Sequence, residues 1–285
     1  MKWRRVIGYL GFKNARFGKI DAHIATCAYA RKFIRQASAI AESQGFKVIH
    51  GIIDSIWLKR EDASEKEYGD LCYEIKTKLN VPISFEGIYK WIVFLNSGMN
   101  PRIPVLNRYY GVTREGKMKV RGIDLRRHDA AGIVRDFQKE ILTLLSSASN
   151  SSEFRELLPR AIEITRNYVR LIRTGQVPQE KLVLEKRLSK SIDEYGSLSQ
   201  QAIAAQKLHD MGRPIHAGQN IRYMVASSEA AIRDNRAVPY ELLARTVGYD
   251  TSAYTSLLIK AFVNLFMPLG YDTRIAKEAL LRTIP

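Results

Sequence analysis

The sequence has little cysteine, few histidines and no long uncharged apolar run. Its two cysteines, Cys27 and Cys72, fall in segments with helical spacing, so we expect reduced thiols rather than a disulfide framework. The five histidines show no metal-ligand spacing, which argues against a zinc site. No uncharged apolar run reaches about 18 residues, so no membrane span is expected. The basic start also lacks the apolar core of a secretory signal.

Acidic residues are scarce relative to basic ones. Lys and Arg number 45 against 29 Asp and Glu, which gives a formal net charge of +16. The basic residues are spread along the chain among aromatic and aliphatic ones, a pattern that favours a folded basic surface over a disordered arm. Such a protein is attracted to polyanions, most commonly nucleic acid. The simpler alternative is a basic surface that serves only solubility.

Hydrophobic periodicity predicts helices and short strands in alternation. Apolar residues recur at helical spacing from Ile20 onward, and β-branched and aromatic residues follow Gly45. Gly87 lies inside a predicted strand, where a glycine is typical of a bulge. We expect helices at residues 20–44, 64–79, 154–172, 199–211 and 251–266, with another from about 133, and strands at 46–58 (two, turning at Asp54), 83–95, 107–112, 117–125, 182–184 and 221–225.

Asp54 is the most informative single residue for chemistry. A carboxylate at a tight turn between two hydrophobic strands is presented at a rigid edge, as a metal ligand or general base should be. The alternative is ordinary turn chemistry, in which the side chain bonds the backbone two residues on. The residues alone leave both interpretations open.

Basic and aromatic residues gather around the predicted hairpin at residues 107–125. Lys117, Lys119 and Arg121 alternate along one strand, so they should form a cationic row spaced about 7 Å apart. Such a row can follow phosphates; the alternative is a solvated face balanced by Glu115 and Asp124. The candidate DNA-binding residues are Arg108, Tyr109, Lys117, Lys119, Arg121, Arg126 and Arg127.

A set of motifs in fixed order resembles the C-terminal part of archaeal family B DNA polymerases. Residues 50–55, His-Gly-Ile-Ile-Asp-Ser, occupy the place of the palm signature tyrosine-glycine-aspartate-threonine-aspartate-serine. Each motif is weak by itself, but the ordered set is specific and covers essentially the whole chain. The other matching segments are residues 8–18 (after the finger helix), 28–31 and 85–89 (palm), 107–111 and 121–129 (primer–template contacts) and 213–225 (thumb).

This resemblance implies an α+β fold with two domains. Residues 1–135 would form the C-terminal part of a palm, an antiparallel sheet with helices, and residues 136–285 a mostly helical thumb. The implied activity is DNA-templated DNA synthesis on a primer–template with deoxynucleoside triphosphates and two Mg²⁺ ions. Asp54 matches the aspartate that holds both ions, and Glu86 matches an acidic residue near them. The implied location is cytoplasmic and nucleoid-associated, without a membrane.

The departures from the family pattern lie at the active site. Ile52 stands where the first signature aspartate is expected, and Ile53 replaces the threonine. The partner aspartate and the finger helix belong to motifs that precede residue 1. Other replaced positions are Arg4 and Arg5 (asparagine-serine), Ile7 (tyrosine), Leu106 and Asn107 (two lysines) and His128 (arginine).

Three hypotheses follow from this pattern. In the first, the chain is one part of a split polymerase that is inactive alone and needs a separate N-terminal polypeptide for the full two-metal site. In the second, it is a non-catalytic remnant that binds primer–template DNA, because relaxed sites tolerate aliphatic replacements such as Ile52. In the third, it is a truncated product whose exposed palm surface is apolar.

Overall fold

The computed structural model describes residues 8–52, 54–97, 100, 103–195, 199–227, 236–245 and 248–282. The chain divides into two compact units, Met1–Ile88 and Tyr89–Pro285. Both contain helices and small antiparallel sheets, which confirms the α+β class. The predicted boundary between palm and thumb at residue 135 follows from the resemblance to polymerases. The division into compact units does not test it, and it stays a prediction. Arg4, Arg5, Ile7 and Ile53 lie outside the described residues.

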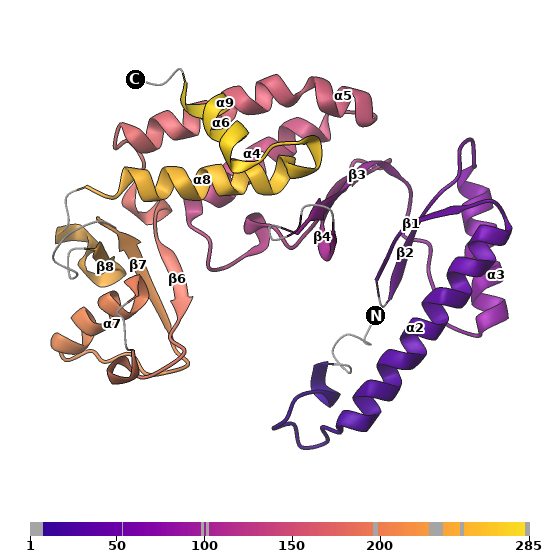
Figure 1. The fold of residues 1–285 in the computed structure, drawn as a ribbon, viewed down its shortest axis with the longest axis horizontal. Coiled ribbons are helices and arrows are strands. Elements are labelled where there is room, and N and C mark those ends of the chain that lie inside the picture. Colours follow the sequence, from indigo (N-terminus) through magenta and orange to yellow (C-terminus); the bar gives the residue numbers. More distant parts are fainter. Residues whose placement is uncertain are drawn as a thin grey trace. The chain divides into compact units, whose positions relative to one another are not determined.

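The first unit packs two helices against a hairpin (Figure 1). Its core comprises Ala37, Ala41, Phe46, Leu71 and Ile75, so the α2 residues that it buries lie near that helix's C-terminal end. The elements are α2 (Ile20–Ser43), β1 (Lys47–Ile52), β2 (Ser55–Lys59) and α3 (Glu65–Leu79).

Local chemistry explains where α3 starts and ends. The Ser64 Oγ accepts a hydrogen bond from the Glu67 backbone N–H, and the Glu67 carboxylate accepts one from the Ser64 N–H at 2.7 Å. This capping box satisfies two amide donors that the first helical turn leaves unpaired. At the other end Asn80 adopts a left-handed conformation with φ of 50°, which ends the helix.

The strand predicted at residues 83–95 begins later in the structure. Strand β3 spans Tyr89–Asn96, and pairing with the next strand starts at Tyr89. Gly87 has φ of +121° and precedes the strand, so it is not a bulge within it. That conformation is open to glycine and interrupts extended backbone. Ile83 instead packs against the core of the first unit.

The second unit contains a three-stranded sheet of β3, β4 (Pro104–Thr113) and β5 (Met118–Arg121). One face of this sheet lies on the core, where Trp91, Tyr110 and Val112 are buried. The buried polar groups are satisfied: Trp91 Nε1 donates to the Ala148 carbonyl at 3.1 Å, and the Tyr110 hydroxyl donates to the Leu265 carbonyl at 2.8 Å. Burial raises the pKa of Tyr110 well above its usual value.

Helices cover the rest of this core, with α8 lying against α4, α6 and α9 (Figure 1). The helix predicted over residues 154–172 is two helices, because Pro159 stands in the first turn of α6 and lacks the N–H that a continuous helix needs. Helix α9 was not predicted. The helices are α4 (Gly132–Ser146), α5 (Ser151–Glu156), α6 (Leu158–Arg173), α8 (Thr251–Phe266) and α9 (Thr273–Leu281).

A second sheet of this unit contains β6 (Leu184–Arg187), β7 (Asn220–Val225) and β8 (Ala237–Pro239), with α7 (Gln200–Asp210) packed against it. Strand β6 starts where the predicted strand ends, and β8 was not predicted. The Tyr254 hydroxyl joins this sheet to α8 by donating to the Leu182 carbonyl at 2.7 Å and accepting from the Val225 N–H at 2.9 Å.

One segment of the described residues, Thr251–Leu269, is long and apolar enough to cross a membrane by length and composition alone. It includes Lys260, so it is not an uncharged run. Half of it is buried within the structure, and Leu258, Phe262 and Phe266 are fully inaccessible. It therefore packs as the central helix of the second unit.

Candidate functional site

Asp54 lies at the turn of the β1–β2 hairpin in the first unit. Ile52 pairs with Ser55 across the hairpin, so the turn between them contains only residues 53 and 54. The Ser55 Oγ is 3.5 Å from the Asp54 Oδ1, and Asp54 is half-buried. The tight turn predicted here is confirmed. It holds the carboxylate at the end of two paired strands, where its position is set by backbone register.

Ile52 lies two residues before Asp54 and is more deeply buried. Its exposed fraction is 6%, and it ends a strand in which His50 and Ile52 are both buried. Successive residues of a strand point to opposite faces, so the buried position is assigned to an aliphatic side chain. The place of the first signature aspartate is thus filled by apolar packing.

Glu86 lies in the irregular segment between α3 and β3 and is exposed. Among the residues that the structure describes, no three His, Cys, Asp or Glu side chains are grouped closely enough to hold a metal ion. Asp54 therefore offers one carboxylate, and the described part of this chain does not assemble a complete metal site.

The candidate DNA-binding residues are in the second unit, several of them on the face of the β3–β4–β5 sheet opposite the core. Tyr109 pairs with Arg121, and Gly111 pairs with Lys119, so Tyr109, Lys119 and Arg121 share one face, on which Tyr109 is buried. Phe94, the β3 partner of Tyr109, has its ring centroid 5.9 Å from that of Tyr109. Arg121 is exposed and Lys119 half-buried, whereas Lys117 lies in the turn before β5. The regular alternation thus covers Lys119 and Arg121 only.

Two glycines shape this surface. A Cβ at Gly111 would come 2.8 Å from the Trp91 carbonyl oxygen, and one at Gly122 would come 2.5 Å from the Asn107 carbonyl oxygen. Gly122 also has φ of +67°, a conformation that side chains disfavour. It turns the chain directly after Arg121 and presents its carbonyl to Arg108 Nε at 3.1 Å.

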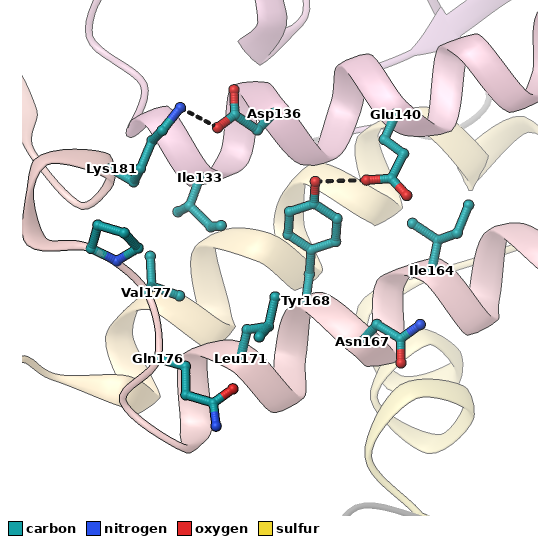
Figure 2. A pocket seen from close by; sticks show the side chains of 11 residues that line it. Ile133, Asp136, Glu140, Ile164, Asn167, Tyr168, Leu171, Gln176, Val177 and Lys181 are labelled. Carbon is teal, nitrogen blue, oxygen red and sulfur yellow. Dashed lines mark hydrogen bonds and ion pairs between the residues drawn. The ribbon is translucent and has the colours of Figure 1, made fainter.

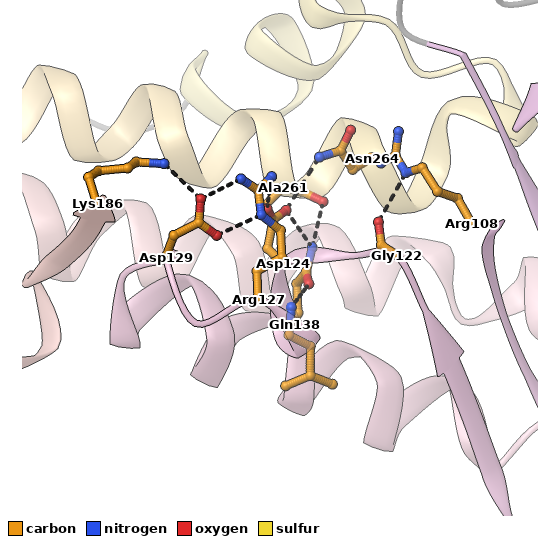
Figure 3. Close-up of polar contacts among 10 residues, drawn as sticks. Arg108, Gly122, Asp124, Arg127, Asp129, Gln138, Lys186, Ala261 and Asn264 are labelled. Carbon is orange, nitrogen blue, oxygen red and sulfur yellow. Dashed lines mark hydrogen bonds and ion pairs between the residues drawn. The ribbon is translucent and has the colours of Figure 1, made fainter. Parts of the chain in front are cut away.

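Arg127 belongs to a network of polar contacts that joins residues 124–129 to α4, β6 and α8 (Figure 3). Its guanidinium donates two hydrogen bonds to the Asp129 carboxylate, at 2.8 and 2.7 Å. Lys186 of β6 donates to the same carboxylate at 2.7 Å. Arg127 and Lys186 hold the pKa of Asp129 well below its usual range, and the two aspartates nearby, Asp129 and Asp124, raise the pKa of Arg127.

Asp124 continues the network toward the helices. Its Oδ2 accepts from Gln138 of α4 and from Asn264 of α8, each at 3.3 Å. The Gln138 side chain is fully buried and also accepts from the Leu125 N–H at 2.7 Å. The neighbouring Arg126, which ends the short helix Asp124–Arg126, is exposed. The segment thus fixes Arg127 to the fold and leaves Arg126 open to solvent.

A pocket of about 390 Å³ that the sequence did not predict lies among α4, α6 and residues 176–181 (Figure 2). Four of its polar side chains form two pairs: the Tyr168 hydroxyl donates to Glu140 at 2.8 Å, and Lys181 donates to Asp136 at 2.6 Å. Burial and the Glu140 carboxylate raise the pKa of Tyr168. The available signal was the i, i+4 pair Asp136 and Glu140, which places two acids on one side of an amphipathic helix.

Several DNA polymerases are similar to this chain in sequence. The DNA polymerase of Archaeoglobus fulgidus is 28% identical over 236 residues, which cover 83% of this chain and 28% of that protein. DNA polymerase 2 of Saccharolobus solfataricus is 31% identical over 159 residues, covering 55% and 24%. The polymerase of Thermococcus kodakarensis is 24% identical over 273 residues, covering 93% and 15%. The chain therefore spans less than a third of the length of these relatives.

A solved structure of a polymerase is similar to this chain in fold. The family B DNA polymerase from Pyrobaculum calidifontis matches with a TM-score of 0.59 and 21% identity, over 98% of this chain and 32% of that one. The family profile described as DNA polymerase family B matches residues 8–269. This match covers most of the chain, and the chain belongs to DNA polymerase family B.

Proposed function

We propose that this chain takes part in DNA-templated DNA synthesis as the C-terminal palm and thumb part of a family B DNA polymerase, with the rest of the polymerase supplied by a separate polypeptide. The observation that supports this most directly is Asp54 at the two-residue turn of the β1–β2 hairpin. A strand-paired turn is a rigid position of the kind that catalytic carboxylates require.

The proposed cofactor is Mg²⁺, with Asp54 as a ligand and Glu86 in a supporting role. When bound, two such ions would activate the primer 3′ oxygen and steady the triphosphate of the incoming nucleotide. The described residues provide one suitably placed carboxylate and no group of three. The remaining ligands would therefore come from the separate polypeptide, and we expect this chain to be inactive alone.

The proposed DNA surface is the face of the β3–β4–β5 sheet that carries Tyr109, Lys119 and Arg121. Exposed Arg121 and the adjacent Lys117 and Arg126 would contact phosphates, whose recognition positions the duplex without reading its sequence. Arg108 and Arg127 already bond to Gly122 and Asp129. Their proposed role combines a DNA contact with support of this surface. We propose a cytoplasmic, nucleoid-associated location on the same grounds.

Primer extension with magnesium tests the proposal. The chain would be assayed alone and mixed with the N-terminal family B polymerase polypeptide encoded in the same genome. We expect extension only in the mixture. Asp54→Ala should lower it by about a thousandfold or more, because a metal ligand is lost. Glu61→Ala serves as the control, since Glu61 is an exposed acid just beyond the same hairpin. Full activity of Asp54→Ala would contradict the assignment.

A second candidate function, binding of primer–template DNA without catalysis, is favoured by one observation. Ile52 is buried where the family carries a carboxylate, as expected when the chemistry has been lost and packing remains. This alternative predicts no extension in any mixture and an affinity for primer–template that is equal with Mg²⁺ and with EDTA. Fluorescence anisotropy on labelled duplex would measure it, and an affinity that requires Mg²⁺ would count against it.

A further inference from the structure

Helix α2 presents an uncovered apolar face in its first half. The helix has 24 residues, and the first residue that it buries is Ala37. Residues 20–36 therefore extend about 25 Å at 1.5 Å per residue without a buried side chain. A helical segment of this length is marginal in water unless one face is packed. The side of this half that carries Ala22, Thr26 and Ala30 is half-buried, whereas the side that carries Ile20 and Ile24 is exposed.

Five of the exposed residues on this half follow one line along the helix. Ile20, Ile24 and Ala28 are spaced four residues apart, so they lie on the same face. Ile20 is 60% exposed and Ile24 is 56% exposed. Arg31 and Arg35 continue the line at spacings of three and four residues and are also exposed. The face therefore passes from aliphatic to cationic toward the middle of the helix.

The segment preceding α2 covers a different side of the helix. The Lys19 N–H donates to the Leu10 carbonyl at 3.0 Å, and a Cβ on Gly11 would lie 3.0 Å from the His23 ring. His23 is half-buried and contacts the Cys27 sulfur at 3.9 Å. His23 and Cys27 therefore lie on the side of α2 that this segment contacts. Ile20, Ile24 and Ala28 lie on a side that this segment does not cover. Phe12 and Phe17, exposed by 59% and 70%, add apolar surface nearby.

We propose that this face of α2 is the docking surface for the separate N-terminal polypeptide of the polymerase; the inference rests on the function proposed above. The matched relatives are more than three times as long as the segments they share with this chain, so most of a polymerase body has no counterpart here. The partner surface should contain an aliphatic groove for Ile20 and Ile24 and acidic groups opposite Arg31 and Arg35. Apolar anchors ringed by charge are typical of protein interfaces.

The test measures affinity between the full chain and the N-terminal polypeptide from the same genome by isothermal titration calorimetry. Ile24→Glu should weaken binding at least about tenfold, because a carboxylate would be buried in an apolar contact. Tyr73→Glu is the matched control, since Tyr73 is 70% exposed on α3 and lies off this face. Circular dichroism should give the same helix content and melting temperature for both variants.

The outcomes distinguish a failure of the proposed docking surface from a failure of the proposed function. If wild type binds and the mixture extends a primer, yet Ile24→Glu binds equally well, the surface is wrong and the proposed function stands. If wild type neither binds nor supports extension, the proposed function fails and the docking surface with it. If light scattering shows that the chain alone dimerises and Ile24→Glu abolishes the dimer, the occupant is a second copy and the inference is overturned.

Discussion

At the scale of single residues, Asp129 is a half-buried carboxylate with several contacts. It receives two hydrogen bonds from Arg127 and one from Lys186. Bidentate pairs between arginine and a carboxylate are stronger and more directional than single contacts. Asp129 therefore joins the segment that follows β5 to strand β6.

We expect Asp129→Asn to lower the free energy of unfolding by about 1–2 kcal/mol, because charge-assisted hydrogen bonds are lost. The folded pKa of Asp129 lies below its unfolded value, so this stabilisation is complete above about pH 4 and is lost as the pH falls below that. Thermal unfolding from pH 3 to 7 should show a melting-temperature gap between wild type and variant that narrows in acid.

The matched control for this prediction is Asp193→Asn, because Asp193 is exposed in a short helical turn of the same unit. Its melting temperature should follow that of wild type at every pH. A gap for Asp129→Asn that stays constant down to pH 3 would mean that the ionised carboxylate is not the source of the stability.

At the scale of elements, the sequence predicted those with local signals and missed those decided by distant contacts. Helix α8 and the hairpin turn at Asp54 were predicted closely, because the helical spacing of one and the β-branched run of the other are local patterns. Pro159 stands at the break between α5 and α6, but the apolar periodicity on both sides of it led to the prediction of a single helix. Strand β8 has three residues and depends on pairing with β7, so no local pattern announces it.

In the candidate site, too, features with local signals were predicted and features that depend on distant contacts were not. Turn chemistry and strand alternation were enough to indicate Asp54 and the shared face of Lys119 and Arg121. Two contacts near these residues were not predictable. Lys186 reaches Asp129 across 57 residues of sequence, and Arg108 donates to a backbone carbonyl, that of Gly122. The pocket beside Tyr168 depends on how α4 and α6 pack, which the sequence pattern of either helix does not contain.

Helix α3 gives a prediction at this scale. Ser64→Ala should lower the free energy of unfolding of the first unit by about 1 kcal/mol, because the capping box at its N-terminus would be lost. Ser43→Ala is the control: Ser43 is the last residue of α2, and its hydroxyl donates only to the Ile40 carbonyl. Chemical denaturation followed by circular dichroism would measure both, and equal midpoints for the two variants would contradict the role of the cap.

At the scale of the whole molecule, the net charge of +16 should govern the proposed binding to DNA. Binding that neutralises phosphates releases counterions, so the logarithm of the affinity should fall linearly with the logarithm of salt concentration. Arg121→Gln should reduce this slope by about 1 and weaken binding similarly for all duplex sequences. The measurement is anisotropy of labelled primer–template at several salt concentrations.

The control for the salt prediction is Arg274→Gln. Arg274 is a well-exposed arginine on α9 whose side chain is paired with Glu278, so removing its charge changes the total by the same amount at another place. An equal loss of slope for both variants would indicate that overall charge, rather than the β3–β4–β5 surface, determines the affinity.

The hydrogen bond from Tyr110 to the Leu265 carbonyl also constrains the order of folding. It joins residues 155 positions apart, and the ring that donates it is fully buried. During synthesis the β3–β4–β5 sheet leaves the ribosome long before α8, so until α8 is made the inner face of the sheet is open to water and its apolar groups are uncovered. Long-range contacts of this kind slow folding and expose intermediates. We therefore expect the nascent second unit to bind chaperones until its last helices have been synthesised.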